Sequence, residues 1–176
     1  MRFSQLDRIL ALEKGKSIQA VKCLSLSEEY LQDHFPRFPV MPGVLMVESM
    51  FQASSFLVRA TNGFQHSTVM LRETRSLKFQ GFVQPGDSLH VNSQITATDG
   101  PITKLKVTGS INDEVACSGR MVVESYNLAE REGVDAAIDH YMIRQFRLTF
   151  RQLCNQLDSE NLSALADLNQ PITTSS

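Results

Sequence analysis

The sequence contains no tryptophan, only three cysteines, and no apolar run long enough to span a membrane. Cys23, Cys117 and Cys154 form neither a CxxC pair nor a metal-binding pattern with histidine, so we expect free thiols and no metal site. The N-terminal residues 1–17 have charges within their apolar pattern and lack a signal-peptide core. These absences argue against membrane-spanning and disulfide-rich secreted proteins, and they make the cytoplasm the expected setting.

An excess of charge of one sign is also missing. The 17 Lys and Arg residues nearly balance the 19 Asp and Glu residues, which leaves a net charge of -2. We therefore expect neither nucleic acid nor a membrane as a partner. At 176 residues and 42% hydrophobic content, the chain is of a size to form one ordinary core.

Segments rich in strand-forming residues dominate the middle of the chain, with turn signals such as Asn62-Gly63 and Asp99-Gly100-Pro101 between them. The predicted strands are residues 17–26, 68–82, 88–98, 102–111 and 115–126, with a short helical turn at 27–33. One apolar helix is predicted from about Gly43 to Ala60. The pattern predicts an α+β fold in which a long antiparallel sheet wraps around one central buried helix.

Glu48 is the only charged residue between Gly43 and Val58. A helix that is apolar on nearly all sides is expected to be buried. A buried carboxylate is costly unless it stays protonated or has specific hydrogen-bond partners. Either state suits a catalytic acid.

The residues just before this helix add two further chemical groups. His34 is a potential base. Pro42 and Gly43 favour a helix start whose unpaired amides are accessible to a ligand. Such amides stabilise a carbonyl oxygen that gains negative charge in a transition state. A base, an acid and an oxyanion site together suit proton abstraction beside a thioester carbonyl and loss of a β-hydroxyl.

The same run resembles the FabZ-type 3-hydroxyacyl-(acyl carrier protein) dehydratases, which have the hotdog fold. Their GHFPxxPxMPGVLxxEAxAQ pattern is matched by His34-Phe35-Pro36, by residues 39–45, and by Glu48 and Gln52. A second family segment, close to KFxxPVxPGDxL, is similar to KFQGFVQPGDSL at residues 78–89. Two ordered segments are more specific than one. There are also departures: Asp33 replaces a glycine, and Phe82 stands where proline is common.

This resemblance implies dehydration of 3-hydroxyacyl thioesters to trans-2-enoyl thioesters, as in fatty acid or related acyl-chain biosynthesis. His34 and Glu48 would be catalytic, and the substrate-binding residues would be Gly43, Val44, Gln52 and Phe35. Gln52 lies one helical turn beyond Glu48, where it is placed either to orient Glu48 or to act as a polar helix-packing group. The implied reaction requires no metal and no other cofactor.

The resemblance also implies partners. The substrate would arrive on the phosphopantetheine arm of an acyl carrier protein. Scattered basic residues either form a docking surface for this acidic carrier or are simply solvated surface residues: Arg37, Arg72, Arg75, Lys78 and Arg120. The two catalytic side chains would come from neighbouring subunits, so a homodimer is the minimum active unit. Hexamers built from such dimers are common in the family.

Three alternatives stay open at this point. A hotdog acyl thioesterase would use the helix carboxylate to activate water or to attack the thioester, and would depend less on His34. A dehydratase of a secondary pathway would keep the chemistry and change the acyl chain. A non-catalytic acyl-binding or assembly subunit would keep the motif without turnover.

We divide the chain into a hotdog dehydratase domain at residues 1–128 and a C-terminal helical extension at 129–176. Residues 135–157 have helical spacing, with Ile138, Phe146 and Phe150 near one face, and residues 171–176 are expected to be frayed. We expect this helix to cover the core or a dimer surface, with a lid or docking element as the alternative.

Overall fold

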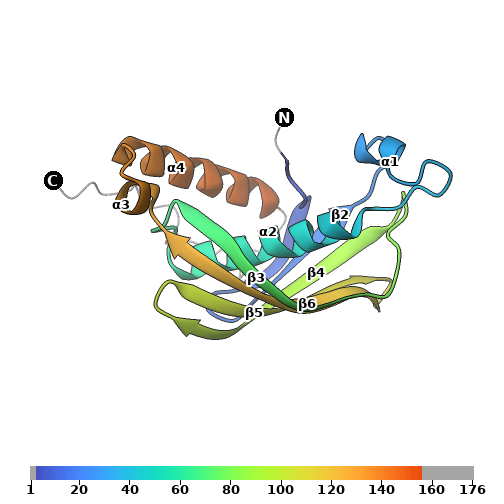
Figure 1. Cartoon of the computed structure of the whole chain (residues 1–176), viewed down its shortest axis with the longest axis horizontal. Helices are drawn as coiled ribbons and strands as arrows, with labels where there is room; N and C mark the ends of the chain where they lie inside the picture. The colour runs from blue at the N-terminus through green and yellow to red at the C-terminus, as the bar shows by residue number, and fades with distance from the viewer. Residues whose placement is uncertain (1–2, 156–176) are drawn as a thin grey trace.

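The computed structural model describes residues 3–155, which form one sheet and, in this part of the chain, four helices (Figure 1). The strands are β1 (Arg8–Glu13), β2 (Ser17–Cys23), β3 (Thr68–Phe79), β4 (Ser88–Asp99), β5 (Ile102–Ile111) and β6 (Glu114–Tyr126). The helices are α1 (Tyr30–Asp33), α2 (Gly43–Thr61), α3 (Leu128–Glu132) and α4 (Ala136–Leu153).

The six strands form one antiparallel sheet in the order β1-β2-β4-β5-β6-β3. Tight turns join β4 to β5 and β5 to β6, where Gly100, Asn112 and Asp113 have positive φ angles of 54°, 49° and 68°. β3 follows α2 in sequence and pairs with β6 at the far side of the sheet. β1 and β3 are therefore the two edge strands.

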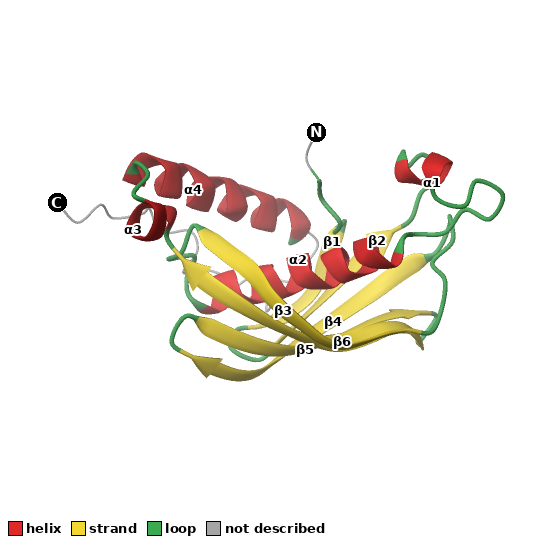
Figure 2. Ribbon diagram, viewed as in Figure 1, coloured by secondary structure: helices red, strands yellow, loops and turns green. Residues whose placement is uncertain are grey.

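Helix α2 lies along the concave side of the sheet, which curves around it (Figure 2). Its buried side chains include Met46, Met50 and Leu57, each 2% exposed or less. The hydroxyls of Ser54 and of Ser93 in β4 are 2.8 Å apart, so the buried polar groups on the two layers satisfy each other. The predicted α+β fold with a long sheet around one central helix is confirmed.

Helix α4 lies over α2, on the side away from the sheet in the view of Figure 1. Asp135 caps its first turn by accepting a hydrogen bond from the amide of Ala137 at 2.8 Å. The Phe150 ring packs 5.7 Å from Phe56 of α2 and 5.3 Å from Phe64. The predicted C-terminal helix is therefore present and covers the core.

Some predicted details were wrong. Ile138, assigned to the apolar face of the C-terminal helix, is 43% exposed, whereas Ile143 is buried. β1 and α3 were not predicted, and β3 ends at Phe79 rather than at residue 82. Residues 156–157 and 171–176 lie outside the described residues, and the division of the chain at residue 128 stays a prediction.

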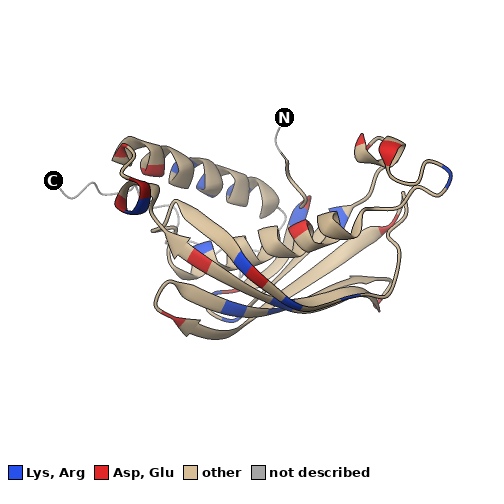
Figure 3. Cartoon of the chain, in the orientation of Figure 1, with Lys and Arg blue, Asp and Glu red and all other residues tan. Residues whose placement is uncertain are grey.

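Charged residues of both signs are interspersed along the strands and helices (Figure 3). Two of the basic residues considered as a docking surface are paired with acids, Arg75 with Glu73 at 2.7 Å and Arg72 with Glu124 at 3.4 Å. Surface pairs of this kind contribute little to stability. Within residues 3–155, no helix combines the length and apolar character needed to cross a membrane.

Candidate active site

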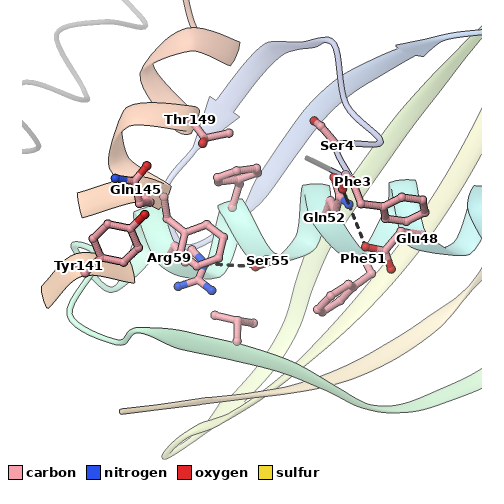
Figure 4. Close-up of a pocket in the computed structure, with 13 residues that line it drawn as sticks. Phe3, Ser4, Glu48, Phe51, Gln52, Ser55, Arg59, Tyr141, Gln145 and Thr149 are labelled. Carbon is pink, nitrogen blue, oxygen red and sulfur yellow. Dashed lines mark hydrogen bonds between the residues drawn. The ribbon is translucent and has the colours of Figure 1, made fainter. Parts of the chain in front are cut away.

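Glu48 and Gln52 lie one turn apart on α2, and their side chains are hydrogen-bonded (Figure 4). The amide nitrogen of Gln52 donates to Glu48 Oε1 at 2.8 Å and to the carbonyl oxygen of Phe3 at 3.0 Å. Its amide oxygen accepts from the backbone N–H of Gln5 at 2.8 Å. The N-terminal segment thus holds Gln52, and Gln52 holds one carboxylate oxygen of Glu48.

Glu48 is less buried than the sequence predicts. Its side chain is only partly buried because it borders a cavity of about 480 Å³, a volume within the range of small-molecule sites. The cavity is lined by Phe3, Ser4, Glu48, Phe51, Gln52, Ser55, Phe56, Arg59, Val69, Tyr141, Gln145, Phe146 and Thr149. The lone carboxylate of α2 therefore faces a cavity with partly apolar walls, and it does not lie in the closed core.

Arg59, the second charged residue of α2, lies at the other end of this cavity (Figure 4). Its Nε donates to Ser55 Oγ at 3.3 Å, and its Nη1 donates to the carbonyl oxygens of His66 and Ser67 at 3.0 and 3.1 Å. The guanidinium carbon lies 3.7 Å from the centroid of the Phe146 ring. Burial lowers the pKa of Arg59 to about 10, so the side chain is still a cation at neutral pH.

His34 ends helix α1, where its backbone N–H donates to the carbonyl oxygen of Tyr30 at 3.1 Å. Its ring is partly buried and lies 4.4 Å from the ring of Phe35. Phe35 is 60% exposed and has a φ of 50°, which is unusual for a residue other than glycine. Non-glycine residues in this backbone region are concentrated at functional sites.

The two motif segments found in the sequence pack against each other. The backbone N–H of Met41, in the first segment, donates to the carbonyl oxygen of Val83, in the second, at 2.9 Å. The rings of Phe38 and Phe82 meet edge to face at 5.6 Å. The second segment therefore holds the loop that connects His34 to α2.

The first turn of α2 contains backbone amides without a partner among the described residues. Pro42 is the N-cap with a φ of -54°, and its carbonyl oxygen accepts from Leu45 and Met46. Among the described residues, no acceptor pairs with the amides of Gly43 and Val44. A Cβ at Gly43 would lie 3.0 Å from the ring of Phe79, so glycine allows this close contact.

Of the residues predicted for the site, the structure brings Glu48 and Gln52 together at the cavity. His34, Phe35, Gly43 and Val44 do not line this cavity within one chain. Sequence reasoning missed Ser55 and Arg59, although both follow Glu48 on the same helix, at the i+7 and i+11 positions that place them near its face. It also missed Tyr141, Gln145 and Thr149, for which the only signal was their i, i+4, i+8 spacing on α4.

Residues 1–120 match the sequence profile of the FabA-like domain. The match covers more than half of the chain and includes both motif segments. The chain therefore belongs to the FabA-like family of hotdog proteins.

Curated relatives narrow the family further. The chain is 39% identical over 113 residues to the 3-hydroxyacyl-[acyl-carrier-protein] dehydratase FabZ of Levilactobacillus brevis, a match that covers 64% of this chain and 76% of that protein. It is 34% identical over 120 residues to the FabZ of Caldicellulosiruptor saccharolyticus, covering 68% and 86% of the two chains. Within the family, the chain is thus FabZ-like.

Solved structures agree on the fold. A chain of the dehydratase heterocomplex ApeI:P from Xenorhabdus doucetiae superimposes with a TM-score of 0.62 at 18% identity, over 74% of this chain and 88% of that one. The smu.793 protein of Streptococcus mutans, solved with acetyl CoA, gives a TM-score of 0.56 at 14% identity, over 72% and 93%. At these identities the likeness concerns the fold alone.

Proposed function

We propose that the protein dehydrates 3-hydroxyacyl thioesters carried by an acyl carrier protein to trans-2-enoyl thioesters. The observation that carries the proposal is the carboxylate of Glu48, which Gln52 holds at 2.8 Å beside a cavity with aromatic walls. An apolar cavity next to a fixed acid suits an acyl chain whose reacting carbons lie at the acid. The relatives named FabZ are 3-hydroxyacyl-[acyl-carrier-protein] dehydratases, and an acyl carrier protein is therefore the expected carrier of the substrate.

In this mechanism the thioester carbonyl accepts a hydrogen bond from the backbone amide of Gly43, at the positive end of the α2 dipole. His34 removes a proton from C2. Glu48 gives a proton to the C3 hydroxyl, which leaves as water while the C2–C3 double bond forms. His34 ends with the C2 proton and Glu48 as the carboxylate, so a proton transfer through water restores both groups for the next turnover.

Because His34 does not border the cavity of its own chain, the mechanism pairs it with the Glu48 of a second subunit. This arrangement agrees with the composite site that resemblance to the family implies. The active form is then a homodimer or a larger assembly of dimers.

The test measures hydration of crotonyl and longer trans-2-enoyl thioesters, the reverse reaction, together with release of free thiol. His34→Ala and Glu48→Gln are each expected to lower kcat/KM by a factor of at least about 10². His90→Ala and Glu114→Gln alter exposed residues outside the cavity and serve as matched controls. Thiol release without hydration would identify a thioesterase, and folded protein with no turnover on any chain length would leave an acyl-binding subunit.

A further inference from the structure

The cavity beside Glu48 contains a buried cation that the proposed dehydration does not use. Arg59 is 4% exposed, and among residues 3–155 no carboxylate lies within ion-pair distance of it. Three of its N–H groups donate to a hydroxyl and two carbonyl oxygens, all of them neutral acceptors. Within the same residues, no protein acceptor pairs with its Nη2.

A buried charge without a counter-charge is costly, and neutral acceptors offset only part of that cost. The lowered pKa of Arg59 reflects the same cost. A purely structural arginine would serve to hold the carbonyl oxygens of His66 and Ser67, and that role does not require the guanidinium to border a cavity. The position of Arg59 on the cavity wall therefore points to an anion as the missing partner.

The cavity has a charged side chain towards each end, Glu48 and Arg59, and several aromatic rings in its wall. Glu48, Gln52, Ser55 and Arg59 follow one another along one side of α2, and the rise from Glu48 to Arg59 is about 16 Å at 1.5 Å per residue. The rings of Phe51, Phe56 and Phe146 also line the cavity. Phe51 lies on the Glu48 side in Figure 4, and the Phe146 ring packs against the guanidinium of Arg59.

Helix α4 completes the Arg59 end. Tyr141, Gln145 and Thr149 come from one face of α4 and add hydroxyl and amide groups to the wall of the same cavity, with Tyr141 and Gln145 on the Arg59 side in Figure 4. This helix lies beyond residues 1–120, the part that matches the FabA-like family. The polar groups that α4 adds to this end therefore come from outside the matched part, whereas Arg59 itself lies within it.

We infer that the Arg59 end of the cavity binds the distal carboxylate of an acyl chain whose 3-hydroxy thioester lies at Glu48. This inference rests on the function proposed above and names its substrate class as ω-carboxy-3-hydroxyacyl thioesters. The carboxylate accepts charge-assisted hydrogen bonds from the Nη2 of Arg59 and from the hydroxyls of α4. A chain that ends in a methyl group leaves the guanidinium unpaired, and the cavity therefore discriminates against it.

The experiment compares enoyl thioesters in pairs of equal length that end in a carboxylate or in a methyl group. For chains that reach Arg59, the native protein is expected to prefer the carboxylate by about 10-fold to 100-fold in kcat/KM. Arg59→Gln should remove the preference, so that the two members of each pair react with similar kcat/KM, because glutamine offers the carboxylate no charge. Equal rates on both members of every pair, or a uniform loss in Arg59→Gln, would overturn the inference.

Arg147→Gln is the matched control, because Arg147 also donates to a backbone carbonyl, that of Gly63 at 3.0 Å, yet does not line the cavity. Its preference for the carboxylate should be native-like. If Arg59→Gln does not fold, Thr149→Glu takes its place: a carboxylate on the cavity wall should pair with Arg59 and abolish the preference. A native preference in folded Thr149→Glu would count against the site.

Crotonyl hydration separates this inference from the proposed function. Hydration of crotonyl thioester without a carboxylate preference would overturn the inference alone. If no thioester reacts, the dehydratase proposal fails. Calorimetry with ω-carboxyacyl and acyl pantetheines then tests whether the cavity still binds a carboxylate. Tighter binding of the carboxylate form that disappears in Arg59→Gln would uphold the carboxylate site, and equal affinity would refute it.

Discussion

Gln52 is the residue that connects the N-terminal segment with the acid of α2. Both N–H groups and the oxygen of its amide have partners, in Glu48, Phe3 and Gln5. This pattern leaves only one orientation of the amide, because a flipped group would oppose donors to donors. Gln52 is thus a positioning residue for Glu48.

Gln52→Met keeps the length of the side chain but removes the hydrogen bond that positions Glu48. We expect kcat for enoyl thioester hydration to fall about 10-fold, because the carboxylate no longer has a fixed position, with a much smaller change in KM. The control is Gln19→Met at an exposed position of β2. A native kcat in a folded Gln52→Met protein would show that Glu48 needs no orienting group.

The three cysteines differ sharply in their environments. Burial raises the pKa of Cys117 to about 11 and that of Cys154 to about 12, whereas Cys23 is exposed. Alkylation requires the thiolate form. At pH 8 the two buried residues are therefore protected both by their burial and by their raised pKa values. Iodoacetamide should modify only Cys23 in the native protein and all three residues in denaturant, as counted by mass spectrometry. Native-state modification of Cys117 would contradict its place in the core.

At the scale of elements, Asp139 of α4 fastens α3 to the rest of the chain. Its carboxylate accepts hydrogen bonds from the amides of Leu128 and Ala129 at 2.9 and 3.0 Å, the first two of α3. Burial alone would raise the pKa of Asp139, but hydrogen bonds from Ser67 and these amides outweigh it and lower the pKa. A residue of one helix thereby caps the start of another.

Asp139→Asn should lower the stability by about 1 kcal/mol at pH 7, the usual value of a helix cap, and lower Tm by roughly 2–4 °C. Because the folded pKa lies below the ordinary 3.8, the stabilisation is complete well above pH 3.8 and declines as pH falls through the lowered pKa. Thermal melts from pH 7 to pH 2 should show the two proteins converging in acid. Asp113→Asn, in an exposed turn, is the control, and parallel curves for Asp139→Asn would contradict the prediction.

The regular elements could be predicted from the sequence where one local pattern decides them. The strand predicted at 102–111 has the bounds of β5, because its side chains alternate and turn residues flank it. In β1, by contrast, a register shift between Ile9 and Ala11 interrupts the alternation. Helix α3 has only five residues and depends on Asp139, so its own sequence contains too little signal.

At the scale of the whole molecule, one part of the candidate site could be predicted from the sequence and another part could not. The spacing of Glu48 and Gln52 on one helix predicted their contact, which the structure confirms. The cavity itself could not be predicted, because α4 brings Tyr141 and Thr149 to the cavity that Arg59 lines, across about 80 to 90 residues of chain. Only packing of the extension against α2 creates that juxtaposition.

The edge strand β3 leads to a prediction about assembly. It spans Thr68–Phe79 and pairs with β6 on one side only, and its exposed side chains include Met70 and Phe79. A long edge strand of this kind needs protection from uncontrolled pairing. Edge-to-edge pairing of two sheets at β3, as resemblance to hotdog dimers implies, would cover it, and we expect a dimer or a multiple of dimers by light scattering.

In such a dimer each proposed site takes His34 from one chain and Glu48 from the other, so two inactive variants should complement each other. After co-refolding of equal amounts of His34→Ala and Glu48→Gln, half of the dimers are mixed, and each mixed dimer has one intact site of two, which gives roughly a quarter of the native activity. Mixing His34→Ala with His34→Gln should restore nothing, because no combination supplies the histidine. Mixed dimers that copurify through different tags and yet stay inactive would place His34 and Glu48 in the same chain's site, and would require His34 to move toward the cavity during turnover.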